Sequence, residues 1–350
     1  RRGSTQDQPR DMSSSKPQSS SGASKSWAEI ETSTDPSSPF AETGFHATCD
    51  DVLSEIDLSG RNVVFTGGYS GIGLAAVRAI AKRGARIFLP ARRPEAAESA
   101  IAKVREETGN SALEIFACDL SSLKSVRSFA ARIAALDIPL HAVVCNAGVM
   151  ATPLRRTAQH FEGQFAVNHL AHFLLVNLLV PQLLRGAPSR VVCVSSLAHT
   201  SSGILWDDIH YHSTEYNKWK AYGQSKSANI MFVSELNRRL ASKSVKAFSL
   251  HPGCILTNLQ RDLPQEEMAA MGWFKNPDTR EPLDIFKTPE RGGATTCFAA
   301  FHPYLDSTPG GAYLVNCGLS EPRRDGLLDA DSGARLWAQS EDMVGQAFEW

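Results

Sequence analysis

The chain has 350 residues, and 36 Lys plus Arg nearly balance 37 Asp plus Glu, so the formal net charge is −1 with His neutral. This balance argues against a protein that binds nucleic acid by neutralising phosphates. The hydrophobic fraction of 42% and the charged fraction of 21% are those of an ordinary globular protein, which excludes disorder throughout the chain.

The cysteines and the apolar runs indicate the cellular location to expect for this protein. The seven cysteines are widely spaced, with no CxxC pair and no zinc-ligand pattern, which favours a reducing compartment. The best candidate for a membrane span, residues 173–184, is too short and contains Asn177 and Pro181, so we expect a core helix. No apolar signal region stands at the amino terminus. We expect a soluble, cytoplasmic protein, with peripheral membrane association left open.

In chain order, a Ser-rich segment precedes an alternation of strands and helices. Residues 1–45 hold twelve Ser and only three of Val, Ile, Leu and Phe, so we expect a disordered tail, followed by one domain over 46–350. Helical periodicity occurs at 123–133 and 228–240, and Thr288-Pro289 is expected to start a helix that ends near Phe301. Apolar runs predict seven strands, at 62–65, 86–89, 113–116, 141–145, 190–194, 246–250 and 312–316. This alternation predicts an α/β fold, a doubly wound parallel sheet with helices on both faces and its active site at the carboxyl ends of the strands.

A glycine-rich turn follows the first strand directly, at residues 66–73 with the sequence TGGYSGIG. The GxxxGxG spacing allows a tight turn, lets the backbone approach a pyrophosphate, and ends at a helix N-terminus with free N–H groups. The alternative is a Gly-rich turn that binds no ligand. We expect cofactor contacts from Gly67, Tyr69, Ser70, Gly71, Ile72 and Gly73.

The end of the second strand bears on which nicotinamide cofactor is bound. A fold that prefers NAD would place an acid here against the ribose 2′-hydroxyl, but Arg92 and Arg93 stand at this position. Their guanidinium groups suit a 2′-phosphate, so NADP(H) is favoured over NAD(H). Arg92 is the stronger candidate, because Arg93 is equally well explained as an exposed surface charge.

Two further strand ends carry candidate cofactor residues. Asp119, followed by Leu120, can accept a hydrogen bond from the adenine amino group, or it can cap the helix that begins near Ser121. After the fourth strand, small residues would permit a close approach of the cofactor ribose. These residues are Asn146, Ala147 and Gly148.

The most specific signal is Tyr222 with Lys226 on a predicted helix. Positions i and i+4 share a helix face, so the ammonium can lie near the phenol and lower its pKa from about 10. Alone, this pair is more often a solvated face. The functional interpretation of this pair depends on two further residues, Ser196 at the end of the fifth strand and Asn168 in an otherwise apolar helix. The Asn168 amide must find hydrogen-bond partners there, and the alternative is that it bonds locally to the backbone.

Together these motifs resemble the short-chain dehydrogenase/reductase family over residues 55–320, within its retinol-dehydrogenase-like and WW-domain-oxidoreductase-like branch but without WW domains. The resemblance implies a single Rossmann-type domain. It also implies that Ser196 orients a substrate carbonyl, Tyr222 transfers the proton, and Lys226 lowers the tyrosine pKa and binds the nicotinamide ribose. Asn168 would hold a water in a proton relay. Near the nicotinamide or pyrophosphate the family places residues equivalent to Pro252, Gly253 and Thr257, and this sequence departs from the branch at Tyr69 and Cys145.

Substrate specificity is expected from residues 197–220 and from a lid at 255–287. The apolar side chains of the lid suit a lipophilic substrate, although a helix packed on the core explains them equally well. Asp and His in the segment 206–212 are expected to form a polar surface turn, and no metal site is predicted. The lid set is Met268, Met271, Trp273 and Phe274, and core or interface positions are expected for His169 and His172.

The leading hypothesis is an NADP(H)-dependent carbonyl reductase or alcohol dehydrogenase that acts on a lipophilic small molecule. A second hypothesis is a non-catalytic NADP(H)-binding regulator whose Ser-rich tail serves for docking or phosphorylation. A third is a membrane-associated lipid enzyme. The family resemblance also implies a homodimer or homotetramer, and residues 320–350 are expected to be a C-terminal extension.

Overall fold

The computed structural model describes residues 31–276 and 278–350. Its centre is an eight-stranded sheet in the order β10-β9-β6-β5-β4-β1-β2-β3, parallel except for β10 against β9. The seven predicted strands are confirmed within two residues at each end. They are β1 (Asn62–Phe65), β2 (Arg86–Ala91), β3 (Leu113–Ala117), β4 (Ala142–Cys145), β5 (Ser189–Val194), β6 (Val245–His251) and β9 (Tyr313–Val315).

The eighth strand, β10 (Gly318–Ser320), was not predicted. It follows β9 through Asn316 and Cys317, whose φ angles of 51° and 57° lie in the left-handed region used by tight hairpin turns. Three residues of strand are too few for an alternation to be recognised in the sequence. A separate two-stranded hairpin, β7 (Phe274–Asn276) with β8 (Glu281–Pro282), lies in the predicted lid.

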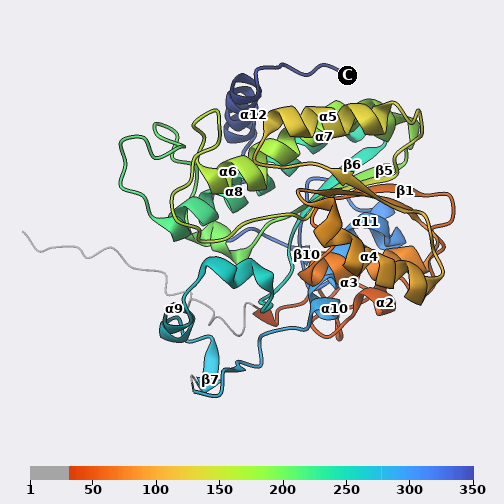
Figure 1. The fold of residues 1–350 in the computed structure, drawn as a ribbon, viewed down its shortest axis with the longest axis horizontal. Coiled ribbons are helices and arrows are strands. Elements are labelled where there is room, and N and C mark those ends of the chain that lie inside the picture. Colours follow the sequence, from red (N-terminus) through yellow and green to blue (C-terminus); the bar gives the residue numbers. More distant parts are fainter. Residues whose placement is uncertain (1–30, 277) are drawn as a thin grey trace, which may run out of the picture.

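Helices cover both faces of the sheet (Figure 1). Along β1, Val64 packs in one apolar layer while Val63 and Phe65 pack in the other, which is the alternation of a strand buried on both sides. One layer contains α5 (Leu123–Ala134), α7 (Ala171–Arg185), α8 (Lys218–Leu240) and α12 (Ala330–Val344). The other contains α2 (Cys49–Val52), α3 (Gly71–Lys82), α4 (Pro94–Thr108) and α11 (Ala294–Phe301). The shorter helical elements are α6 (Gly163–Phe165), η1 (Ala166–Leu170), η2 (Leu197–Ser201), η3 (Ala241–Lys243), η4 (Asn258–Asp262), α9 (Gln265–Ala270), α10 (Pro289–Gly292) and η5 (Pro303–Asp306).

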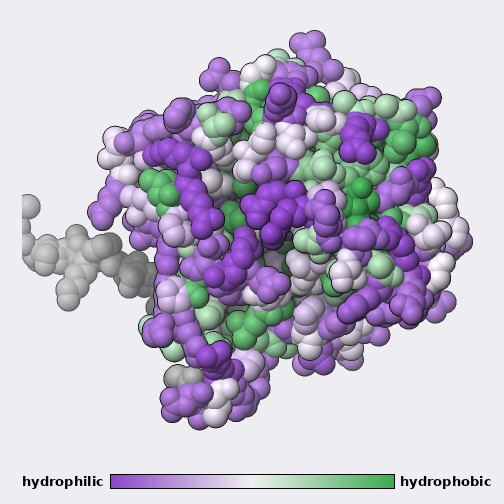
Figure 2. Space-filling model, viewed as in Figure 1, coloured by the Kyte–Doolittle hydropathy of each residue, from purple (hydrophilic) through white to green (hydrophobic). Residues whose placement is uncertain are grey.

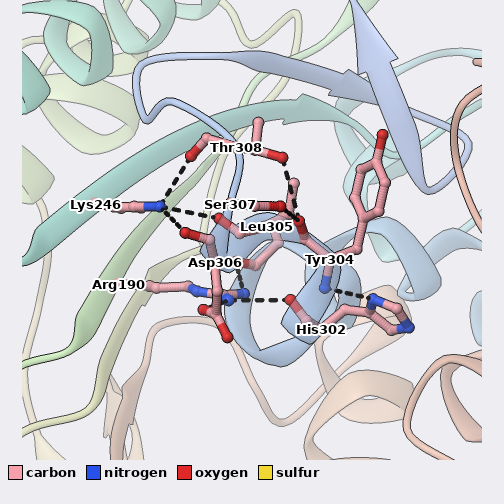
Figure 3. Close-up of polar contacts among 9 residues, drawn as sticks. Arg190, Lys246, His302, Tyr304, Leu305, Asp306, Ser307 and Thr308 are labelled. Carbon is pink, nitrogen blue, oxygen red and sulfur yellow. Dashed lines mark hydrogen bonds and ion pairs between the residues drawn. The ribbon is translucent and has the colours of Figure 1, made fainter.

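The late helix begins as predicted. The Thr288 side chain accepts from the backbone N–H of Arg291, and α10 and α11 run from Pro289 to Phe301. Two cations hold the far end of α11 and the following η5 against the sheet (Figure 3). Arg190 of β5 donates to the carbonyl of His302 at 3.0 Å and to Oδ1 of Asp306 at 2.6 Å. Lys246 of β6 donates to three backbone carbonyls, those of Leu305, Asp306 and Thr308.

The predicted core helix is confirmed. The continuous helical stretch Gly163–Arg185 is long and apolar enough to cross a membrane, but 78% of its most apolar window is buried inside the fold. The C-terminal extension adds a helix that the sequence analysis did not predict. On α12, the Trp337 ring stacks on Phe232 of α8 at 5.9 Å, and Ser340 Oγ lies 2.9 Å from Nε2 of His169.

The predicted disordered tail is wrong for residues 31–45, while residues 1–30 lie outside the described part of the chain. We call residues 31–46 the N-terminal strap. Phe40 packs edge-on against Phe298 at 5.9 Å, and Ser38 Oγ donates to the carbonyl of Cys317 at 2.5 Å. Composition suggested disorder because the strap carries little apolar surface of its own. It is ordered instead by hydrogen bonds to the β9–β10 turn and to β10, and by packing of Phe40 against α11.

Candidate active site

The turn after β1 has the geometry that the glycine spacing predicts. Gly67 and Gly71 have φ angles of +67° and +53°, which favour glycine. A Cβ atom at Gly73 would lie 2.3 Å from the carbonyl oxygen of Gly67, so helix α3 approaches the turn too closely for any side chain. Ser70, the N-cap of α3, makes no side-chain capping bond and is exposed.

These features fit the pyrophosphate of a dinucleotide. The first turn of α3 offers backbone N–H groups without a side-chain cap, and the glycines leave its approach open. Thr257 lies at the same place, because a Cβ on Gly71 would be 3.3 Å from the Thr257 side chain. Thr257 Oγ1 also accepts from the N–H of Leu259 at 3.1 Å, so it caps η4 at the start of the lid. Tyr69 and Ile72 are partly buried beside the turn.

Asn146 and Ala147 hold the glycine turn in shape. The Asn146 side chain donates to the carbonyls of Thr66 and Gly67 at 3.0 and 3.2 Å. The backbone N–H groups of Asn146 and Ala147 both donate to Thr66 Oγ1 at 2.9 Å. The sequence analysis stressed the small size of this segment and missed Thr66, although Thr66 opens the quoted motif.

The end of β2 presents Arg92 and Arg93 as exposed side chains, and neither forms an ion pair with any described residue. Asp119, after β3, accepts from both the N–H and the hydroxyl of Ser121 through Oδ1, at 2.9 and 2.8 Å. The cap of α5 is Ser122 rather than Ser121, since the Ser122 side chain accepts from the N–H of Ser125. Asp119 therefore stabilises the turn before the helix, and its Oδ2 accepts no hydrogen bond within the described chain.

Tyr222 and Lys226 lie in α8 as predicted, both almost fully buried at 4% exposure. The Lys226 ammonium lies 5.5 Å from the centre of the Tyr222 ring and donates to the carbonyl of Val194 at 2.9 Å. Burial raises the pKa of Tyr222 to about 12, although a hydrogen bond with Ser196 acts to lower it. Burial also lowers the pKa of Lys226 to about 8.

The expected lowering of the tyrosine pKa by Lys226 does not appear in this geometry. Desolvation of the phenolate outweighs the effect of an ammonium whose hydrogen bond goes to Val194 rather than to the phenol oxygen. The phenol is therefore protonated at neutral pH, which is the form that can donate a proton to a carbonyl.

Ser196 lies near Tyr222 and Asn168 lies near Lys226, and the two residues belong to different elements. Ser196 follows β5, and its Oγ accepts from the N–H of Ala198 at 3.1 Å. Asn168 lies in η1, a π-helical turn, where its amide exchanges two hydrogen bonds with the Val149 backbone at 2.8 and 2.9 Å. Its Nδ2 also donates to Ser225 Oγ at 2.9 Å. The alternative of a locally bonded Asn168 is wrong, because these partners belong to the β4 loop and to α8.

Gly148 lies beside Asn168 and Lys226. A Cβ at Gly148 would lie 3.2 Å from Asn168 Oδ1 and 3.7 Å from Lys226 Nζ. Gly253, after Pro252, has a φ of +96° and packs against the Lys287 side chain. Leu120 is partly buried against the core beside Asp119.

The segment predicted as a lid packs near Tyr222. Tyr222 shares an apolar cluster with Met150, Ala151 and Leu263, against which Met268 and Trp273 of the lid are packed. Met271 is instead 44% exposed, and Phe274 lies in β7 outside this cluster. Apolar residues gather on this face between α9 and α10 (Figure 2). The lid is fastened by Glu267, which bonds Lys218 Nζ at 2.5 Å and Trp219 Nε1 at 2.9 Å.

Other titratable groups have structural roles. Asp208 accepts from the N–H groups of His212, Ser213 and Thr214, as a polar surface turn requires. The core positions predicted for His169 and His172 are confirmed, with both 1% exposed. No cluster of metal-ligating side chains occurs among residues 31–276 and 278–350.

Comparison with known proteins identifies the family of this chain. Residues 61–268 match the family model described as short chain dehydrogenase. The chain is 37% identical over 313 residues to short-chain dehydrogenase TIC 32 B, chloroplastic, of Brassica napus, which covers 86% of this chain and 94% of that protein. It is also 37% identical over 294 residues to retinol dehydrogenase 13 of Homo sapiens, and the matched region covers 83% of this chain and 87% of that protein.

Solved structures show the same fold. An uncharacterized protein from Mycobacterium paratuberculosis superposes with a TM-score of 0.68 at 33% identity, over 87% of this chain and 99% of that one. The RhlG/NADP active-site complex of Pseudomonas aeruginosa shares the fold with a TM-score of 0.57 at 23% identity, over 74% of this chain and 95% of that one.

The chain belongs to the short-chain dehydrogenase/reductase family. Its similarity to retinol dehydrogenases places it in the retinol-dehydrogenase-like branch. It is therefore an oxidoreductase that transfers hydride between a nicotinamide cofactor and a small molecule.

Proposed function

We propose that this protein is an NADP(H)-dependent carbonyl reductase or alcohol dehydrogenase for a lipophilic small molecule. The observation that carries the proposal is the Tyr222 phenol, which is 4% exposed and buried in an apolar cluster with residues of the lid, and whose pKa is raised by burial although Ser196 acts to lower it. A protonated phenol next to a hydroxyl, surrounded by apolar side chains, can bind and polarise a carbonyl oxygen away from water.

The cofactor would be held along the carboxyl ends of the strands. The uncapped start of α3 suits the pyrophosphate, and Asp119 can reach toward the adenine. Two exposed arginines and no acid at the end of β2 support a 2′-phosphate, hence NADP(H). When bound, the reduced nicotinamide supplies a hydride at its C4 atom.

In the reductive direction the protein supplies the proton and the orientation. The substrate oxygen would accept hydrogen bonds from Tyr222 and Ser196, and the Tyr222 proton would pass to it as the alcohol forms. Lys226, held by the Val194 carbonyl, would bond the nicotinamide ribose. By the family resemblance, Asn168 would place a water for the proton relay. Its side chain is fixed for this, because Oδ1 and Nδ2 bond the Val149 backbone after β4 and Nδ2 also bonds Ser225 of α8.

The class of substrate follows from the surroundings of Tyr222. Burial of apolar surface against Met150, Leu263, Met268 and Trp273 would favour a lipophilic aldehyde or ketone. The Glu267 bonds to Lys218 and Trp219 join the lid to the start of α8, so movement of the lid would open the site.

The test is NADPH oxidation with a panel of lipophilic aldehydes and ketones, in wild type and in Tyr222→Phe. We expect turnover to fall by about 10²- to 10⁴-fold, the usual contribution of a general acid, with NADPH affinity unchanged. Tyr211→Phe is the matched control, because the Tyr211 hydroxyl is buried without a hydrogen-bond partner in the described chain. Retained turnover in Tyr222→Phe refutes the assignment. NADPH binding without turnover of any carbonyl by wild type favours the non-catalytic regulator instead.

The proposal includes a cytoplasmic location and a homodimer or homotetramer. All seven cysteines are free thiols, which supports a reducing compartment. Flotation of the purified protein with liposomes tests the alternative of a membrane-associated enzyme, and light scattering measures the oligomeric state.

A further inference from the structure

Glu31 of the N-terminal strap lies in a buried polar cluster behind the catalytic Ser196. Its side chain has 0% exposure, and its Oε1 lies 2.9 Å from Nε2 of His251 and 3.4 Å from Sγ of Cys254. The strap, red at the start of the described chain in Figure 1, reaches this place beside β10. A buried carboxylate is costly unless it is paired, so its position here needs specific partners.

Those partners keep Glu31 ionised. Burial acts to raise its pKa, but His251, the Cys254 thiol and the nearby Lys287 together hold the pKa below its ordinary value. Lys287 is itself buried and donates to Asn316 Oδ1 at 2.5 Å. Glu31 is therefore a charged acceptor for His251.

His251 links this carboxylate to the backbone next to Ser196. The N–H of Leu197 donates to Nδ1 of His251 at 3.1 Å. Because Nδ1 is the acceptor, the ring proton is on Nε2 and is donated to Glu31. One ring thus connects Glu31 to the residue that follows Ser196. The other side of Ser196 is held independently, since the N–H of Ser195 donates to the Leu250 carbonyl at 2.7 Å.

The strap has its own anchors besides the Glu31 side chain. Asn316 Nδ2 donates to the backbone carbonyls of Glu31 and Ser33 at 2.7 and 2.8 Å. Asp35 Oδ2 accepts from the N–H of Leu319 at 2.9 Å. Ser33, Leu197 and His251 also line one small crevice, so the strap lies directly against the Ser196 corner. Truncating the Glu31 side chain therefore removes the bond to His251 while these anchors remain.

We propose that Glu31 is a positioning residue, which acts through His251 on the Leu197 backbone and so keeps the Ser196 hydroxyl directed at the substrate carbonyl. This rests on the proposed function, in which Ser196 orients that carbonyl. Nothing in the Ser-rich composition around Glu31 indicates this role.

The kinetic test compares Glu31→Ala, Glu31→Gln and Asp35→Ala. We expect Glu31→Ala to lower kcat by about tenfold, as the loss of one charge-assisted hydrogen bond would, with NADPH affinity unchanged. Glu31→Gln should retain most of the kcat, because its amide oxygen can accept from His251 and Oε2 has no hydrogen-bond partner in the described chain to lose. Asp35→Ala, which loosens the strap elsewhere, should leave kcat unchanged. Equal losses in all three variants, or no loss in Glu31→Ala, would overturn the proposal.

A double-mutant comparison tests whether Glu31 acts through His251. If it does, adding Glu31→Ala to His251→Ala lowers kcat no further than His251→Ala alone. Additive losses would show that Glu31 acts by another route and would contradict the proposal.

Hydrogen exchange separates this proposal from the proposed function, because it needs no substrate. The Leu197 amide should exchange faster in Glu31→Ala than in wild type, Glu31→Gln or Asp35→Ala. An unchanged Leu197 amide in Glu31→Ala overturns the link through His251, whatever the activity. If wild type turns over no carbonyl while the Leu197 amide responds as expected, the proposed function fails and the link itself is upheld.

Discussion

Thr66 Oγ1 lies 2.9 Å from Nε2 of His172, so the residue that opens the glycine turn is bonded to the helix that follows Asn168. His172 Nδ1 lies 3.0 Å from the Asn168 carbonyl and must donate to it, which leaves Nε2 as the acceptor. The Thr66 hydroxyl therefore donates to His172 and accepts the N–H groups of Asn146 and Ala147. One hydroxyl holds together the glycine turn, the β4 loop and the Asn168 helix.

Replacing this hydroxyl by a methyl group should destabilise the protein and weaken its cofactor binding. Thr66→Val is nearly isosteric but leaves two N–H groups and the His172 ring without their partner, at a cost of about 1–3 kcal/mol for each unsatisfied group. Urea unfolding and NADPH titration measure the two effects. Thr296→Val is the matched control, because Thr296 Oγ1 is buried with no partner among the described residues and its loss should cost nothing. Equal stability of the two variants would contradict this role of Thr66.

The close approach of α3 to the turn predicts the effect of a single methyl group. In Gly73→Ala the new Cβ would lie 2.3 Å from the Gly67 carbonyl oxygen, so the turn or the helix must shift, and NADPH binding should fall by at least tenfold. Gly203→Ala serves as control, since its nearest neighbour is the Arg324 side chain at 3.0 Å, which can move. Isothermal titration with NADPH distinguishes the two, and normal affinity in Gly73→Ala would refute the assigned turn.

The cofactor preference depends on Arg92. Loss of a charge-assisted bond to the 2′-phosphate in Arg92→Ala should weaken NADPH binding by about 10- to 100-fold and leave NADH binding unchanged. Arg93→Ala should have a smaller effect, because Arg93, the exposed N-cap residue of α4, is equally well explained as a surface charge that does not contact the cofactor. Dissociation constants for both cofactors in both variants provide the measurement. An equal loss of affinity for NADPH and NADH in Arg92→Ala would show that Arg92 does not bind the 2′-phosphate.

Buried histidines predict acid sensitivity of the fold. Burial lowers the pKa of His169 to about 3 and that of His172 to about 4, from 6.5. Between pH 6.5 and 4 the unfolded chain therefore binds more protons than the folded chain, so stability is lost as the pH falls through this window.

The variant that tests this is His169→Leu. Each such histidine should account for about 2 kcal/mol of lost stability between pH 7 and pH 5. Urea unfolding of His169→Leu at these two pH values should show a pH dependence smaller by this amount, whatever its absolute stability. His212→Leu, at an exposed position, should keep the wild-type pH dependence. An unchanged dependence in His169→Leu would contradict the burial argument.

The strands and the glycine-rich turn were within reach of sequence reasoning, because their signals are local. A strand buried on both faces must be a short apolar run, and a turn that meets a phosphate must be rich in glycine. The same holds for Tyr222 and Lys226, whose spacing on one helix is set by the helical repeat. The segment predicted as a lid does pack beside Tyr222, but only half of its predicted apolar set contacts the cluster around that residue.

Pairings between distant segments were decided only by the tertiary structure. Composition alone predicted a disordered strap, yet Glu31 bonds His251 at a separation of 220 residues. The pKa of Tyr222 shows the same limit, since helical spacing predicted a decrease while burial under the lid raises it to about 12. Local sequence determines which residues can form a strand, a turn or a helix. It does not determine which polar groups share a buried space, because desolvation and long-range hydrogen bonds exist only once the chain has packed.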